Sequence, residues 1–247
     1  MGGLNTYSGI LLCGCKGTRL RELTRDQVLK PLLKIGGKEL IRYSIDLLEP
    51  DIVTKLVFAL DYKADQMKKW VSKTNLPYTV EFSEQHKPSI LEAVREASKR
   101  VNTDSIIFCN TDEIRERLSL KEVIRGHEAS NKLATVVGTD ARNLFSQGVL
   151  EIKEDGTVTD LRFKDKKYEL RPLEIGLVTT GFMVMKKIAV DYFDPRIDLN
   201  MRGITAPLIK MGELRVHIDQ NIVFFNSNTP EQFYEARDYL MKDSDKY

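Results

Sequence analysis

The stretch SGILLCGCKGTRL (residues 8–20) joins an apolar run to a glycine-bearing turn with two basic residues. The run SGILLC has the length and composition of a buried strand, and Gly14 and Gly17 mark a turn directly after it. In open α/β sheets, ligands bind beyond the carboxyl ends of the strands. The stretch therefore predicts the first strand of such a sheet and, at its carboxyl end, a binding loop.

The alternation of strand and helix continues through the first half of the chain. Apolar residues at helical spacing fall within 41–48, 67–71 and 91–101, the last stretch with Ser89 or Pro88 near its start. Further apolar or β-branched runs are KLVFAL (55–60), YTVEF (78–82), SIIFCN (105–110) and LATVVG (133–138). This order predicts a mostly parallel sheet covered on both faces by crossover helices.

The pattern changes near residue 145. GVLEIKEDGTVTDLRF (148–163) holds two alternating segments around Asp155-Gly156, which predicts a hairpin, and a long strand GLVTTGFMVM (176–185) comes next. We therefore predict an α/β fold: a Rossmann-like open mixed, mostly parallel sheet flanked by helices, with an added antiparallel hairpin or lid region. Residues 1–247 would form one domain, in which the pattern divides 7–140 from 141–247.

The amino-acid composition indicates which classes of partner and which cellular compartment to expect. Lys and Arg number 38 against 36 Asp and Glu, a balance that favours neither nucleic acid nor an anionic membrane surface as a partner. Three cysteines form no secretory framework, and no stretch reaches the roughly 20 apolar residues of a membrane span. We expect a cytoplasmic protein whose partners are small molecules or other proteins.

The glycine loop has the chemistry of a phosphate site. Gly14 and Gly17 allow backbone N–H groups to point into one concavity, while Lys16 and Arg19 add positive charge. Neither the Walker pattern nor the dinucleotide fingerprint is present. The alternative is a tight turn with solvated cations.

Five motifs in order carry a family resemblance. LLCGCKGTRL followed by LKPLLKIGGKELIRYSIDLL resembles the signature of the sugar-1-phosphate nucleotidyltransferases, which include heptose-1-phosphate guanylyltransferase-like and cytidylyltransferase-like members. FCNTDEI, RFKDKK, TTGFMVM and FFNSNTPEQFYEA then stand where that family writes N-G-D, F-x-E-K-P, N-A-G-I-Y-V-F and D-x-G-T-P-E. The match extends over most of the chain, and it implies that 7–140 is the nucleotide-binding half and 141–247 the acceptor-binding half.

The resemblance implies a role for each matched residue. Arg19 would hold the departing β- and γ-phosphates, Lys30 would stabilise charge at the α-phosphoryl group, and Mg²⁺ would be the cofactor. The implied nucleotide residues are Gly14, Cys15, Lys16, Gly17, Thr18, Glu84, Ser89 and Asn110. The implied acceptor residues are Asp165, Lys166, Thr180 and Gly181, and the implied metal ligands are Asp112 and Asn226.

Plainer interpretations stand beside these roles. Lys30 could be a solvated loop cation, Asp112 or Glu113 a helix cap, and Asp165-Lys166 an exposed hairpin end. RERLSLKEVIRGHE (115–128) is predicted to be a solvated helix face with its preceding turn.

The chain also departs from the family pattern. Cys15 replaces a loop glycine, PSILEAV (88–94) replaces a glycine-rich nucleobase loop, and Asn228 replaces a glycine. Asn226 replaces the second metal-binding aspartate, so the metal site loses one charge unless a carboxylate such as Asp219 compensates. These changes leave the base unspecified.

The resemblance implies an enzyme of nucleotide-sugar biosynthesis that transfers a nucleoside monophosphate from a nucleoside triphosphate to a sugar-1-phosphate or a related phosphorylated small molecule, with release of pyrophosphate. The alternatives are a cytidylyltransferase for a non-sugar phosphate and a non-catalytic binding or regulatory relative. A glycosyltransferase would need D-x-D where the chain has NTDE, with one aspartate in register. A homo-oligomer is an option that the helix stripes do not require.

Overall fold

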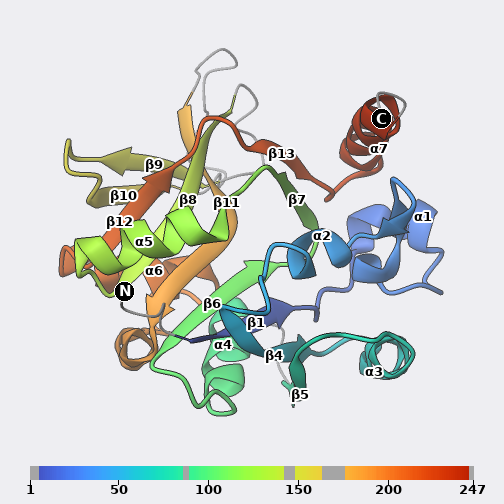
Figure 1. Cartoon of the computed structure of the whole chain (residues 1–247), viewed down its shortest axis with the longest axis horizontal. Helices are drawn as coiled ribbons and strands as arrows, with labels where there is room; N and C mark the ends of the chain where they lie inside the picture. The colour runs from blue at the N-terminus through green and yellow to red at the C-terminus, as the bar shows by residue number, and fades with distance from the viewer. Residues whose placement is uncertain (1–5, 86–88, 142–147, 163–175, 245–247) are drawn as a thin grey trace.

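A mixed sheet of nine strands runs through the part of the chain that the computed structural model describes, residues 6–85, 89–141, 148–162 and 176–244 (Figure 1). Seven strands follow the order β10-β9-β11-β6-β1-β4-β5, and β8 pairs with both β11 and β12. The strands are β1 (Tyr7–Leu12), β4 (Val53–Leu60), β5 (Thr79–Glu84), β6 (Ser105–Asn110), β8 (Ala134–Ala141), β9 (Val149–Ile152), β10 (Val158–Arg162), β11 (Gly176–Lys186) and β12 (Leu214–Ile218). The sheet takes strands from both sides of residue 141.

The first half of the sheet is parallel, as the sequence predicts. β1 pairs in parallel with β4 and β6, and β4 pairs in parallel with β5, so their carboxyl ends lie along one edge. Helices α3 (Ala64–Ser72) and α4 (Ile90–Ser98) connect these strands. All the predicted strands of this half are present, which confirms the α/β interpretation.

Alternating side chains give the sheet an apolar core on each face. On β1, Ile10 belongs to the core under α4 and α6 (Met201–Lys210), whereas Leu11 belongs to the opposite core. That opposite core lies under α2 (Arg42–Ile45), α3 and α5 (Leu120–Ser130). Helices on both faces leave the strand ends as the accessible edge of the parallel half.

The second half is antiparallel. β11 pairs antiparallel with β6 and β8, and β9 and β10 form the predicted hairpin at the sheet edge. In its turn Gly156 has φ 79°, and the backbone N–H of Thr157 donates to Asp155 Oδ1 at 2.9 Å. The glycine and the aspartate thus act as the hairpin signal indicates.

The helix expected at 41–48 is shorter than its apolar stripe. α2 is one turn, although Ile41, Ile45 and Leu48 are all buried. Several bonds in this stretch span three residues, as in Leu48 N–H to Ile45 O at 2.9 Å, and Pro50 soon follows. Because a residue before proline disfavours helical angles, the chain turns tightly here and does not extend the helix.

Two small sheets flank the carboxyl edge. β2 (Lys34–Ile35) pairs with β3 (Lys38–Glu39), and β7 (Glu113–Glu116) pairs antiparallel with β13 (Val223–Asn226). Helix α7 (Pro230–Ser244) follows β13 and lies near the short helix α1 (Arg21–Thr24) in Figure 1. Chain segments far apart in sequence therefore meet beside the loop after β1.

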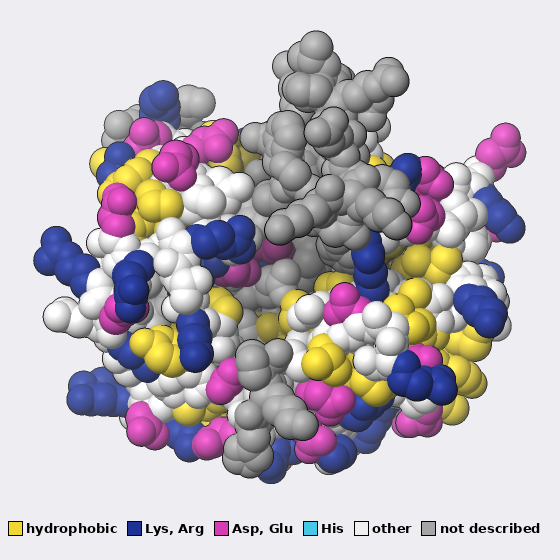
Figure 2. Space-filling view, turned by 180° about the vertical axis from the view of Figure 1, so that it is seen from behind, with side chains coloured by type: hydrophobic (Ala, Val, Ile, Leu, Met, Phe, Trp, Pro, Cys, Tyr) yellow, Lys and Arg dark blue, Asp and Glu magenta, His cyan; other side chains and the backbone are white. Residues whose placement is uncertain are grey.

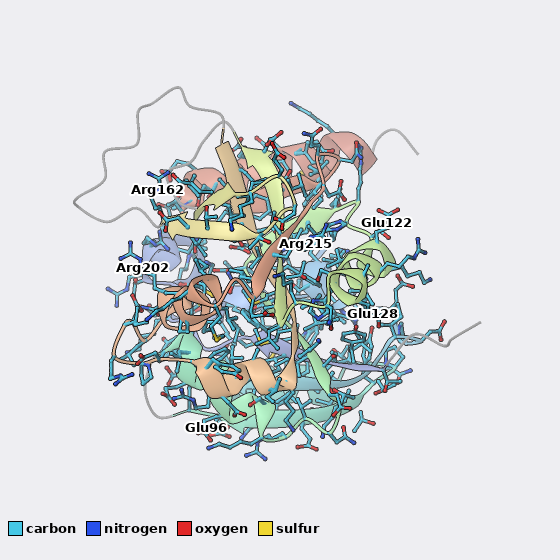
Figure 3. The ribbon with its side chains drawn as sticks, turned by 90° about the vertical axis from the view of Figure 1, so that its left-hand side faces the viewer. Glu96, Glu122, Glu128, Arg162, Arg202 and Arg215 are labelled. Carbon is cyan, nitrogen blue, oxygen red and sulfur yellow. The ribbon has the colours of Figure 1, made fainter. Side chains whose placement is uncertain are left out.

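The interpretation of 115–128 as a solvated face is wrong in part. Arg115 lies on β7 and is 1% exposed, and α5 buries Val123, Ile124 and His127. Figure 3 shows α5 with Glu122 and Glu128 beside β12, whose Arg215 donates to Gly126 O at 3.0 Å. The charged residues of α5 line only its outer face, because the inner face packs on the sheet.

The surface carries mixed charge. In Figure 2, basic and acidic side chains are interspersed over the face seen from behind. None of the helices in the described ranges is long and apolar enough to cross a membrane.

Candidate functional site

The loop after β1 lies at the carboxyl edge of the sheet. Cys13 N–H donates to Ala59 O at 2.9 Å, which carries the loop along the end of β4. Gly17 has φ 61° and begins the turn η1 (Thr18–Leu20). A Cβ on Gly17 would lie 3.0 Å from Lys30 Cβ, so this glycine lets the loop pack directly against the Lys30 stem.

Lys30 connects three distant segments. It begins the turn η2 (Lys30–Leu32), and its side chain is only 3% exposed. Its Nζ donates to Asp112 Oδ2 at 2.6 Å and to Asn228 Oδ1 at 2.7 Å. Lys30 is therefore not the solvated loop cation of the plainer interpretation, and the structure brings two of the predicted site residues, Lys30 and Asp112, into contact.

Asp112 and Glu113 do not cap a helix. β6 ends at Asn110, residues 111 and 112 form a bend, and strand β7 begins at Glu113, so no helix begins at this position. The Glu113 carboxylate is buried, and it pairs with the buried guanidinium of Arg115. Burial raises the pKa of the Glu113 carboxyl above its usual range, although the Arg115 charge opposes the shift.

Two adjoining cavities surround Lys30 and Asp112. The smaller, about 330 Å³, is lined by Cys15, Lys16, Gly17, Thr18, Arg19, Lys30, Asp112 and Asn228. The larger, about 360 Å³, is lined by Leu12, Gly14, Cys15, Ala59, Gln85, Ser89, Ile90, Ala93, Asn110, Asp112, Glu113, Asn200 and Asn228. They share Cys15, Asp112 and Asn228. The smaller cavity is the basic one, with three cationic side chains among its lining.

The residues expected around the nucleobase divide into two groups. Ser89 lines the larger cavity, but its hydroxyl caps α4 by accepting from Glu92 N–H at 3.1 Å and donates to Leu199 O at 2.5 Å. Glu84 is exposed and pairs with Lys68, whereas the next residue, Gln85, lines the cavity. At the end of β5, Gln85 and not Glu84 is therefore the polar residue that faces the larger cavity.

The residues expected around the acceptor are also divided. The Thr180 hydroxyl is buried against Val137 O at 3.2 Å. Gly181 has φ 61°, and a Cβ there would collide with the side chains of Glu113 and Asn110. The space over Gly181 is filled by protein side chains, not left open for a ligand ring. Asp165 and Lys166 lie outside the described residues.

Asn226 lies directly opposite Glu113 in the β7–β13 pair. It is 8% exposed, and its Oδ1 is buried with no hydrogen-bond partner in the described part of the chain. The neighbouring N–H of Ser227 donates to Asp112 O at 3.0 Å, which ties this strand end to Asp112. Asp219, which the sequence offers as a compensating carboxylate, is found in the lining of neither cavity.

For four site residues the sequence predicts no binding or catalytic role: Gln85, Glu113, Arg115 and Asn228. Glu113 and Arg115 are two positions apart, so on a strand they share one face, and opposite charges at that spacing are a signal for a pair. In the sequence, Asn228 stands out only because it replaces a glycine of the family pattern. Its φ is not positive; its side chain matters instead, because it accepts from Lys30.

Known proteins resemble this chain in sequence and in fold. The mannose-1-phosphate guanyltransferase of Yarrowia lipolytica is 28% identical over 232 residues, covering 91% of this chain and 61% of that protein. The "Probable glucose-1-phosphate cytidylyltransferase" of Bacillus subtilis is 26% identical, covering 84% of this chain and 86% of that protein. The chain spans 51 to 62% of the length of three mannose-1-phosphate guanyltransferases that it matches.

The crystal structure of HddC from Yersinia pseudotuberculosis has a TM-score of 0.74 and 23% identity, covering 95% of this chain and 99% of that one. HddC has also been crystallised in complex with GMP-PN. At this identity the likeness establishes the fold. The model of the nucleotidyl transferase family matches residues 8–221, which is most of the chain. The chain therefore belongs to the nucleotidyl transferase family.

Proposed function

We propose that the protein transfers a nucleoside monophosphate from a nucleoside triphosphate to a sugar-1-phosphate or a related phosphorylated small molecule. One observation carries the proposal: the Lys30 ammonium, held by Asp112 and Asn228, lies where a basic cavity meets a larger one. The basic cavity suits a triphosphate tail, and the larger cavity has room for a nucleoside and an acceptor. The names of the matched sugar-phosphate relatives support the same reaction.

In this reaction an oxygen of the acceptor phosphate attacks the α-phosphorus of the triphosphate. The new P–O bond forms as the bond between the α-phosphorus and the bridging oxygen breaks, and that oxygen leaves with pyrophosphate. Such a transfer needs positioning and charge neutralisation more than covalent help. Lys16 and Arg19 would hold the departing phosphates, Gly14 and Gly17 would let the loop backbone approach them, and Lys30 would stabilise negative charge at the α-phosphoryl group.

The two halves of the chain would share this work. The half at 7–140 supplies the loop, Lys30 and Asp112, and the half at 141–247 supplies Asn226, Asn228 and, we propose, the acceptor contacts of Asp165 and Lys166. Three free cysteines, two of them buried, are in keeping with a reducing compartment such as the cytoplasm.

The donor atoms at Asp112 and Asn226 fit a hard divalent cation such as Mg²⁺. Asp112 offers a carboxylate and Asn226 a buried carbonyl oxygen that lacks a partner within the described residues. Mg²⁺ in proteins is often bound by one or two carboxylates together with substrate phosphates and water, and when bound it neutralises phosphate charge. We propose that these two side chains hold it.

Replacing Asn226 with aspartate should tighten binding of the metal. The substitution Asn226→Asp adds one negative charge at the proposed metal site without changing side-chain size, and we expect metal affinity to rise about tenfold. Mn²⁺ binding followed by electron paramagnetic resonance measures this without relying on turnover. Asn102→Asp, which adds the same charge at an exposed position, is the control. Equal affinity in Asn226→Asp and wild type would remove Asn226 from the metal site.

Pyrophosphate release tests the function itself. The purified protein is assayed with each common nucleoside triphosphate against sugar-1-phosphates and non-sugar phosphates, with and without Mg²⁺. Release that requires one triphosphate and one acceptor supports the transferase. Nucleotide binding without release across the panel would favour a binding relative that has kept only the fold.

A further inference from the structure

The pair of Glu113 and Arg115 is buried at the edge of the larger cavity. The Glu113 side chain is 5% exposed and the Arg115 side chain 0%. Arg115 also donates to Thr180 O at 2.5 Å and to the Glu113 carbonyl at 3.1 Å. Desolvating two charges offsets much of their attraction, so stability alone is a weak reason for a pair at this position.

The Glu113 carboxylate is fixed from three sides. Arg115 pairs with Oε2, and Asn110 Nδ2 donates to Oε1 at 3.2 Å. Gly181, at φ 61°, leaves the space that the Glu113 and Asn110 side chains occupy. Each carboxylate oxygen receives one hydrogen bond from these residues and can accept a second. Glu113 and Asn110 both line the larger cavity, so this spare capacity is available to a molecule within it.

The sheet order places Glu113 and Gln85 on opposite sides of the loop after β1. Along the carboxyl edge the strands run β5, β4, β1, β6 and β11. Gln85 follows β5, the loop with Gly14 follows β1, and Glu113 lies beyond β6. With the triphosphate in the basic cavity and its base assigned to the Gln85 side, the Glu113 side is left for the acceptor. This step rests on the proposed function.

We propose that Glu113 determines acceptor specificity by accepting hydrogen bonds from hydroxyl groups of the acceptor. The ligand class is a phosphorylated polyol or sugar. A quaternary ammonium acceptor fits less well, because Arg115 neutralises the carboxylate and the described residues that line the larger cavity include no aromatic side chain for the cation. Arg115 and Asn110 act as positioning residues for Glu113.

Steady-state kinetics with the acceptor identified by the pyrophosphate assay test this role. Glu113→Gln is expected to raise the KM for the acceptor at least tenfold and to change the KM for the triphosphate less than twofold. The same acceptor is then compared with its monodeoxy analogues. Removing the hydroxyl that Glu113 binds should raise the acceptor KM strongly for wild type and little for Glu113→Gln. The deoxy analogue and the substitution each remove the same interaction, so their effects do not add.

Two further variants separate recognition from folding. Glu113→Asp keeps a charge for Arg115 but withdraws the oxygens from the cavity, and it should also raise the acceptor KM. Glu116→Gln, the same change as Glu113→Gln on the same strand but outside the cavity lining, should leave both KM values unchanged.

The outcomes distinguish this inference from the proposed function. A wild-type protein that releases no pyrophosphate overturns the function and this inference with it. An active wild type with unchanged acceptor KM in folded Glu113→Gln and Glu113→Asp overturns the role of Glu113 alone. Turnover of phosphocholine in preference to every sugar phosphate would also overturn it.

Discussion

Replacing Lys30 with alanine is expected to lower turnover about 10²–10³-fold, the usual cost of removing one donor that stabilises developing charge. The ammonium contacts Asp112 and Asn228 at the junction of the two cavities. Among the described residues, no other lysine or arginine forms an ion pair with Asp112 or a hydrogen bond with Asn228. Pyrophosphate release at saturating triphosphate and acceptor measures the loss.

The fold should survive this change. Breaking a fully buried pair is strongly destabilising, but Asp112 is 18% exposed and lines both cavities, so water can reach its carboxylate. Lys30→Met provides a second variant, since it keeps the aliphatic stem that packs against Gly17 while removing the charge. The exposed Lys34, changed to alanine, is the control. Wild-type turnover in folded Lys30→Met would exclude Lys30 from the mechanism.

Replacing Gly181 with alanine is expected to destabilise the protein by about 3 kcal/mol. The left-handed backbone at φ 61° costs an L-residue about 1 kcal/mol, and the new Cβ would also displace Glu113 and Asn110. The Glu113 carboxylate cannot move without weakening its bond to Arg115, which leaves a buried charge poorly paired. The free energy of unfolding from urea denaturation measures the effect.

Gly212 offers a matched control for the cost of placing an alanine in a left-handed backbone conformation. It has φ 70°, and nothing lies within 4 Å of a Cβ built there. Gly212→Ala should therefore cost only the left-handed strain, about 1 kcal/mol. If both alanine variants lose the same stability, then crowding by Glu113 and Asn110 adds nothing at Gly181, and the fixed position of the carboxylate is in doubt.

Local patterns in the sequence were enough for most of the fold. The apolar runs of β1, β4 and β6 and the Asp155-Gly156 turn each predicted an element that the structure contains. The helix at 41–48 was overestimated, because an apolar stripe reports burial and does not by itself report helical hydrogen bonding.

The site roles of Lys30 and Asp112 were implied by the family resemblance. The local sequence patterns alone determined the class of sheet and the loop after β1. These two conclusions rest on periodicity, on glycine conformation and on the rule that sites lie beyond strand ends, all of which depend on neighbouring residues.

Only the tertiary structure decided which side chains meet at the site. Lys30 contacts Asp112 across 82 positions and Asn228 across 198, and Glu113 becomes a buried, paired carboxylate because β13 covers β7 and Gly181 leaves it space. No local pattern encodes contacts at such separations, because they arise from the packing of distant segments against one another.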